Sequence, residues 1–170
     1  MSVIVVGKGP SLIGKRLGKQ IDEFKTIIRL TNGRQNKDYG IQADYVLAVS
    51  CEAYLIEKVR ANNVWLYDTE TPWEDIKGTY INDFIRKWLD MYKEIAKPLN
   101  QHNHPHVTWF CKGTAAILTV MEVLHPKCIC VAGLDNVMKG KRTWHCHDFS
   151  AEKRVIDTAS KELECQIYQL

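Results

Sequence analysis

The sequence has no long hydrophobic run and no low-complexity segment. None of its apolar runs approaches the ~20 residues that a membrane-spanning helix needs. Proline is scarce, with 5 residues in 170, while 45% of the residues are hydrophobic and 25% are charged. These proportions exclude a disordered chain, a collagen-like repeat and a disulfide-rich miniprotein. The length of 170 residues predicts one soluble domain spanning residues 1–170.

The N-terminus also lacks the features of a secretory signal. Only Val3–Val6 precede a glycine turn, and no basic segment comes first. We therefore expect a cytoplasmic protein, in the host cytoplasm if the source is viral, with no membrane partner. Without export, the six cysteines favour reduced thiols over disulfides. The net charge of +3 is compatible with an anionic partner but does not demonstrate one.

Short apolar runs alternate with amphipathic segments along the chain. Val3–Val6 is a continuous β-branched run, which is typical of a strand buried on both faces of a parallel sheet. The alternation predicts an α/β fold, a single Rossmann-like three-layer sandwich with a mostly parallel sheet, whose strand order the sequence does not indicate. Further strands are expected at 26–30, 45–49, 64–67, 107–110, 128–132 and 166–170, and helices at 12–24, 52–60, 80–96, 114–124 and 149–163.

The first strand ends in a glycine-rich turn, Gly7-Lys8-Gly9-Pro10-Ser11. Ligands of open α/β sheets lie beyond the carboxyl ends of strands, where glycines allow close approach and a helix N-terminus attracts phosphate. The turn therefore predicts a nucleotide site, although a tight turn that binds nothing is an equally good interpretation. The full P-loop and dinucleotide patterns are both missing, so P-loop kinases and NAD-linked enzymes are minor alternatives.

Three separate segments resemble the motifs of the sialyltransferases, glycosyltransferase family 29. The opening turn, continued through Gly18–Asp22 and Ile28–Asn32, resembles the large sialyl motif, and its Val-Gly-x-Gly-Pro-Ser-Leu form is closer still to the small bacterial sialyltransferases. Lys112–Ala115, a helix and Cys128–Asp135 resemble the small sialyl motif. His147 and Glu152 fit the family's His-x4-Glu element, whereas residues 50–105 match none of its motifs.

The resemblance implies an inverting, metal-independent glycosyltransferase that moves a sugar from a nucleotide-sugar donor, with a CMP-sugar favoured, to a hydroxyl acceptor. The donor is a substrate, and no cofactor is implied. The resemblance implies three catalytic residues. They are His147 as the base, Glu152 as a residue that holds the site together, and His145 as a contact to the leaving phosphate. The implied donor-binding residues are Gly7, Lys8, Gly9, Pro10, Ser11, Asn32, Gly113, Thr114 and Asp135.

From the residues alone, these roles have competing interpretations. A histidine suits proton abstraction because its free pKa of ~6.5 lies near working pH, but His147 before a helix is also typical of a capping or surface histidine. Glu152 is equally well explained as a solvated carboxylate in the first turn of a helix. No DxD pair is present for a divalent ion, and the histidines at 102, 104, 106, 145 and 147 leave a structural zinc site as a further alternative.

The sequence also departs from the family pattern. Lys8 replaces an asparagine of the first turn, Thr31 stands where the next family asparagine belongs, and the motif cysteines of the animal enzymes are missing. These departures and the short length suit a minimal phage or bacterial protein. The acceptor is left open between a hydroxymethylated base in DNA and a small glycan. A non-catalytic nucleotide-binding or sequestering protein of the same fold is the alternative function.

Overall fold

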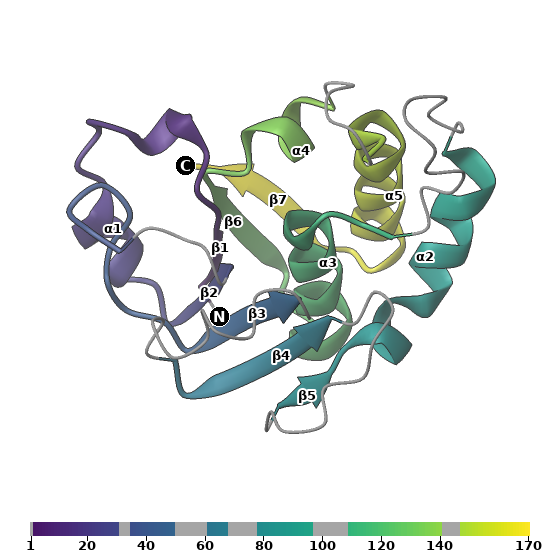
Figure 1. Ribbon diagram of the computed structural model, residues 1–170, viewed down its shortest axis with the longest axis horizontal. Coiled ribbons are helices and arrows are strands. Elements are labelled where there is room, and N and C mark those ends of the chain that lie inside the picture. The colour runs from purple at the N-terminus through teal and green to yellow at the C-terminus, as the bar shows by residue number, and fades with distance from the viewer. Residues whose placement is uncertain (1, 31–34, 50–60, 68–77, 97–108, 141–146) are drawn as a thin grey trace.

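The computed structural model describes residues 2–30, 35–49, 61–67, 78–96, 109–140 and 147–170. Its centre is a seven-stranded sheet in the order β5-β4-β3-β2-β1-β6-β7, in which all neighbours are parallel (Figure 1). The predicted α/β class is thus confirmed. The strands are β1 (Val3–Val6), β2 (Thr26–Leu30), β3 (Tyr45–Val49), β4 (Asn63–Tyr67), β5 (Thr79–Tyr80), β6 (Cys128–Ala132) and β7 (Gln166–Gln169).

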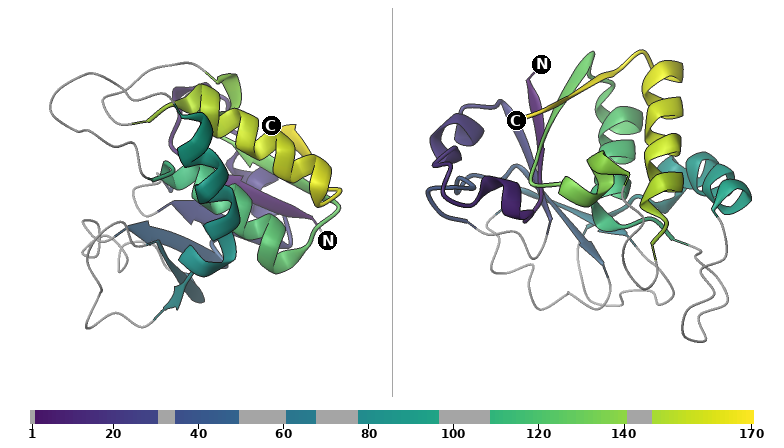
Figure 2. Two further views of the ribbon diagram at one scale, coloured as in Figure 1. Left: turned by 90° about the vertical axis from the view of Figure 1, so that its right-hand side faces the viewer. Right: turned by 90° about the horizontal axis from the view of Figure 1, so that it is seen from above.

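Helices lie on both faces of the sheet, which gives three layers (Figure 2). On one face are α2 (Asn82–Ile95), α5 (Phe149–Glu162) and α3 (Lys112–Thr119), which continues as the π-helical turn Val120–Leu124. The short α1 (Gly18–Asp22) lies on the other face, and α4 (Asp135–Lys139) follows β6. Among the described residues, no helix combines the length and apolar character that crossing a membrane requires.

β1 is an interior strand, between β2 and β6, and all four of its side chains are apolar. Val3 and Val5 belong to the larger core under α2, α3 and α5, whereas Ile4 and Val6 belong to the smaller core on the α1 side. All four are at most 1% exposed. The prediction of a strand buried on both faces is therefore confirmed, since alternate side chains of a strand face opposite layers.

The prediction of a long helix over residues 12–24 is wrong. The structure has a 3-10 turn at Pro10–Leu12, then irregular backbone, then only the five residues of α1. Gly14 and Arg16 adopt positive φ angles of 78° and 54°, and their N–H groups donate to the Asp38 carboxylate at 3.1 and 3.0 Å. A carboxylate from a distant segment thus replaces the helical acceptors of these amides.

The strand expected at 107–110 is also absent from those of its residues that the structure describes. Residues 107 and 108 lie outside the described part, while Trp109 and Phe110 belong to no strand. The Phe110 N–H instead donates to the Tyr67 hydroxyl at 2.9 Å, which takes the place of a ladder hydrogen bond. The helix expected at 52–60 lies entirely outside the described residues.

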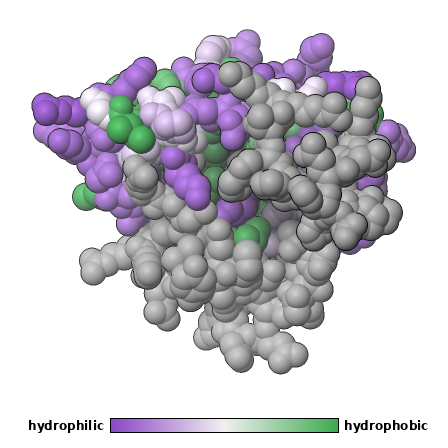
Figure 3. Space-filling view, turned by 45° about the horizontal axis from the view of Figure 1, so that its top comes forward, coloured by the Kyte–Doolittle hydropathy of each residue, from purple (hydrophilic) through white to green (hydrophobic). Residues whose placement is uncertain are grey.

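Large exposed apolar side chains are few and scattered among the described residues. They are Ile13, Ile41, Tyr80, Phe84 and Tyr168, which come from different elements. The face seen in Figure 3 is mainly hydrophilic where it is described, with small separate hydrophobic spots. Single exposed apolar residues of this kind are ordinary on folded proteins and mark no broad docking surface.

The order of the strands reverses between β1 and β6. Strands β2 to β5 extend the sheet on one side of β1, and the chain then returns to place β6 and β7 on the other side. Gly7, after β1, and Gly133, after β6, therefore lie next to each other at the carboxyl edge. Such a switch point is where open α/β sheets bind their ligands.

Candidate active site

The glycine turn is held tightly against the loop after β6. The Gly7 N–H donates to the Ala132 carbonyl at 2.8 Å, and the Gly9 N–H donates to the Gly133 carbonyl at 2.7 Å. A Cβ at Gly7 would lie 2.4 Å from the Gly133 carbonyl oxygen, so a glycine is required for this approach.

These bonds change the expected mode of phosphate binding. The sequence predicted that free backbone N–H groups and a helix N-terminus would receive the anion, but the Gly7 and Gly9 N–H groups are already bonded within the protein. The Ser11 N–H is also used, since it donates to the Asp135 carboxylate at 3.0 Å. The side chain of Lys8 is exposed and carries the positive charge of the turn. A phosphate at this turn would therefore meet the Lys8 side chain and not the N–H groups of Gly7, Gly9 or Ser11.

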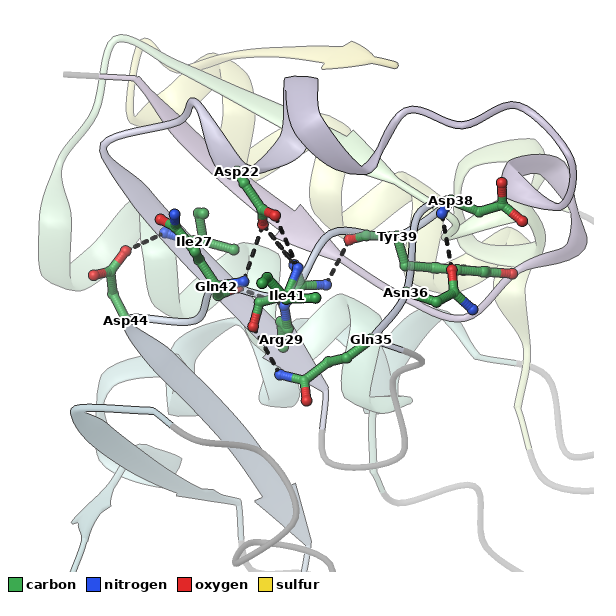
Figure 4. A network of polar contacts seen from close by, with 10 residues as sticks. All are labelled: Asp22, Ile27, Arg29, Gln35, Asn36, Asp38, Tyr39, Ile41, Gln42 and Asp44. Atoms are coloured by element: carbon green, nitrogen blue, oxygen red, sulfur yellow. Dashed lines mark hydrogen bonds and ion pairs between the residues drawn. The ribbon is translucent and has the colours of Figure 1, made fainter.

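A polar network joins Asp22 and Arg29 to the segment that precedes β3 (Figure 4). The buried Arg29 guanidinium donates to the carbonyls of Gln42 at 2.6 Å and Tyr39 at 2.8 Å, and it pairs with Asp22 at 3.4 Å. Tyr39, fully buried, extends its hydroxyl to the Gly9 carbonyl, to which it donates at 3.1 Å. The segment that follows β2 thereby fixes the Gly9 peptide from the α1 side of the sheet.

Glu152 lies at the centre of a second cluster, where α3 and α5 begin. It is 0% exposed, and its carboxylate accepts from the Cys111 N–H at 3.0 Å and from the Thr114 hydroxyl. The interpretation of Glu152 as a solvated carboxylate is therefore wrong. Buried carboxylates need such donors because desolvation otherwise disfavours the charge.

His147 lies directly against this carboxylate. Its Nδ1 is 3.2 Å from Glu152 Oε1, and its side chain is 22% exposed. The Nδ1 atom is buried, and no regular hydrogen bond to it is formed. If Nδ1 carries the proton toward Glu152, Nε2 is the basic nitrogen.

Burial and the charge of Glu152 perturb the neighbouring acids. Burial chiefly, and Glu152 next, raise the pKa of the Cys111 thiol and of the Tyr92 hydroxyl well above their ordinary values. Burial also raises the pKa of Tyr67, although its bond from Phe110 opposes part of the shift. These groups stay protonated near neutral pH and are therefore available to the cluster as hydrogen-bond donors.

Leu134 connects the two parts of the site. Its Cδ2 atom would be 2.5 Å from a Cβ on Gly7 and 3.0 Å from a Cβ on Gly113. The glycine of the first turn and the glycine that opens α3 thus pack against the same methyl group of Leu134. Because α3 and α5 each run into the amino end of a strand, their N-termini lie at the same carboxyl edge as Gly7.

The predicted residues fall into these two groups. Gly7, Lys8, Gly9, Pro10, Ser11 and Asp135 form the switch-point turn, and Gly113, Thr114, His147 and Glu152 form the cluster at the start of α3 and α5. Asn32 and His145 lie outside the described residues, as do His102, His104 and His106.

Several supporting residues were missed from the sequence. Cys111 caps α3 by accepting from the Thr114 N–H, and Asp148 caps α5 by accepting from Ser150 N and Ala151 N, both at 3.1 Å. An aspartate just before a periodic apolar run is a recognisable cap signal for Asp148. Tyr39 carries no such signal, because its role depends on a contact made across the fold.

Comparison with known proteins shows similarity at the level of structure. No protein-family model matches the chain, and no curated protein matches it significantly. Two solved structures of a mammalian sialyltransferase are similar to this chain. One superposes with a TM-score of 0.64, and the other, in complex with Gal-beta-1-3GalNAc-ortho-nitrophenol, superposes with a TM-score of 0.62. In both, identity is 16%, and the match covers 98% of this chain and 68% of the sialyltransferase. The chain therefore has a sialyltransferase-like fold.

Proposed function

We propose that the chain is an inverting glycosyltransferase that uses a nucleotide-sugar donor, with a CMP-sugar favoured, and His147 as the base. The observation that carries the proposal is the contact of His147 with the buried Glu152, at the sheet edge that also holds the glycine turn. A base oriented by a buried carboxylate is the arrangement that proton abstraction from a hydroxyl needs. The fold shared with the mammalian sialyltransferase supports the same reaction class.

In the proposed reaction, an acceptor hydroxyl attacks the anomeric carbon of the donor from the face opposite the phosphate. The bond from that carbon to the phosphate oxygen breaks, and the nucleotide leaves with the electron pair. His147 Nε2 takes the hydroxyl proton, and Glu152 stabilises the resulting imidazolium through Nδ1. The exposed Lys8 ammonium suits the departing phosphate by its charge.

The acceptor is proposed as a hydroxyl of either a hydroxymethylated DNA base or a small glycan. The two classes differ in how salt affects binding. A DNA acceptor contacts the protein through several phosphates, so its affinity falls steeply with salt concentration. A neutral glycan acceptor keeps its affinity across the same range.

A ligand screen followed by one substitution tests the proposal. A cytidine or uridine nucleotide, tested as CMP, CDP or UDP against NAD, is expected to raise the melting temperature, because a ligand of the folded state stabilises it. His147→Ala is then expected to lower turnover of the matching nucleotide sugar ~100-fold or more with donor affinity unchanged. The matched control is His125→Asn, which changes an exposed histidine that precedes β6 at the opposite edge of the sheet.

Each alternative predicts a different result. If NAD is the nucleotide that stabilises the protein, the chain is NAD-linked. If a pyrimidine nucleotide binds but the wild type never turns over a nucleotide sugar, the chain is a non-catalytic binder. Turnover that survives His147→Ala overturns the assignment of the base.

A further inference from the structure

We propose that Ser11 and Asp135 bind a hydroxyl group of the nucleotide's ribose and thereby select ribonucleotides over deoxyribonucleotides. The inference rests on the proposed nucleotide donor and assigns a chemical role to one part of its site. It starts from two buried polar atoms, Ser11 Oγ and Asp135 Oδ1, that have no hydrogen-bond partner.

The two side chains are joined at the switch point between β1 and β6. Asp135 is only 8% exposed, and its Oδ2 accepts from the Ser11 N–H at 3.0 Å. That bond leaves Asp135 Oδ1 and the Ser11 hydroxyl unsatisfied on the same pair of residues. Leaving a buried carboxylate oxygen without a donor is costly, so the pair is suited to a group that arrives with the ligand.

The chemistry of the pair identifies the kind of group. A carboxylate oxygen only accepts hydrogen bonds, whereas a serine hydroxyl both donates and accepts. A sugar hydroxyl can donate to Asp135 Oδ1 and accept from Ser11 Oγ at the same time. A phosphate at this position would have no proton to donate and would be repelled by the carboxylate. Among the described residues, Asp135 has no ion pair that would cancel this repulsion.

The glycine turn permits this arrangement. A Cβ on Gly9 would lie 2.5 Å from Asp135 Oδ2, so only a glycine lets the carboxylate lie against the turn. The phosphate is expected beside the exposed Lys8 ammonium, because the Asp135 carboxylate would repel it. Because neither unsatisfied atom reaches solvent before binding, the turn has to open to admit the ribose.

A binding experiment compares CMP with 2′-deoxy-CMP and 3′-deoxy-CMP by calorimetry. For the wild type, we expect at least one deoxy ligand to bind ~10-fold or more weakly, as for the loss of a hydrogen bond to a charged group. Ser11→Ala keeps the backbone bond to Asp135 and removes only the hydroxyl. Asp135→Asn keeps one acceptor oxygen and removes the charge.

For the deoxy ligand that binds the wild type more weakly, the ratio of its dissociation constant to that of CMP is compared between variants. Both substitutions are expected to bring this ratio close to one without loss of the fold. Thr158→Ala, which removes a hydroxyl that bonds to its own helix in α5, is the matched control and is expected to keep the ratio. A buried water between Ser11 and Asp135 is the competing explanation for the unsatisfied atoms. In that case the substitutions change the melting temperature but not the ratio.

The outcomes separate the two proposals. If CMP and both deoxy ligands bind the wild type equally well, the hydroxyl-binding role is overturned while the nucleotide site stands. If the ratio is the same in Ser11→Ala, Asp135→Asn and the wild type, another part of the protein reads the ribose and the assignment is likewise overturned. If no ribonucleotide binds at all, the proposed function fails and this inference fails with it.

Discussion

Single residues decide how closely the parts of this site approach each other. Gly9 has an ordinary φ of −59°, so its importance is one of space and not of backbone conformation. A Cβ there would lie 2.5 Å from Asp135 Oδ2 and 2.7 Å from the Gly133 carbonyl oxygen. Gly14 is the opposite case, because its φ is +78° and a Cβ there would meet no packed neighbour within 4 Å.

The two glycines therefore predict different effects of the same substitution. Gly9→Ala is expected to cost about 1–3 kcal/mol of unfolding free energy by overpacking, and to weaken nucleotide binding by displacing Asp135. Gly14→Ala is expected to cost about 1 kcal/mol, from left-handed backbone alone, with binding kept. Urea unfolding and calorimetry measure both effects. Normal nucleotide affinity in Gly9→Ala would contradict the close packing of the turn.

At the scale of elements, the segment between β2 and β3 is fixed by charge and hydrogen bonds. Asp22, at the end of α1, accepts from the N–H groups of Ile41 and Gln42, while Arg29 of β2 holds two carbonyls of the same segment. Burial lowers the pKa of Arg29 to about 10, although the charge of Asp22 opposes the shift. The guanidinium is still charged near neutral pH, and its several donors suit carbonyl groups in different directions.

This network predicts that arginine and lysine are not equivalent at position 29. Arg29→Lys is expected to lower the free energy of unfolding by about 1–3 kcal/mol, because a single ammonium cannot reach all three acceptors. Arg86→Lys is the matched control, since Arg86 pairs with Asp83 on the exposed side of α2 and little change is expected. Urea unfolding of both variants checks the prediction. Equal stability of Arg29→Lys and the wild type would show that the network is not structural.

For the whole molecule, the buried acids predict how stability depends on pH. Burial raises the pKa of Cys165 to about 11 from an ordinary value of 9.0, and the pKa values of Cys111, Tyr67 and Tyr92 are also raised. Above the ordinary pKa, the unfolded chain releases these protons while the folded chain keeps them. The contribution of these groups to the free energy of unfolding is therefore complete below pH 9 and is lost as the pH rises.

The expected free energy of unfolding falls from about pH 9, where the thiols ionise in the unfolded chain, and more steeply above pH 10, where the tyrosines do. A fully protected group contributes up to about 1.4 kcal/mol per pH unit. Tyr67→Phe is expected to reduce the slope above pH 10 and to leave the slope from pH 9 to 10 unchanged. Tyr168→Phe, which changes an exposed ring, is the control. Denaturant titrations at stepped pH measure these slopes, and an unaltered slope in Tyr67→Phe would refute the assignment.

Local patterns predicted most of the elements because they depend on neighbours in the chain. The β-branched run of β1, the apolar periodicity of α2 and α5, and the edge strand β7 all agree with their sequence signals. The helix expected at 12–24 failed because the acceptor for Gly14 and Arg16 is Asp38, which no local pattern connects to them. The catalytic and donor-binding roles, the cytoplasmic location and the microbial or viral source stay predictions.

The sequence by itself determined the α/β class and marked the turn at Gly7 and the pair at His147 and Glu152, because alternation and motif spacing are written along the chain. Only the tertiary structure decided the strand order, the burial of Glu152 and the meeting of Ser11 with Asp135. These features depend on contacts between segments that are distant in sequence, such as the bond between residues 11 and 135. Hydrophobic burial drives those segments together without specifying in the local sequence which neighbour each will meet.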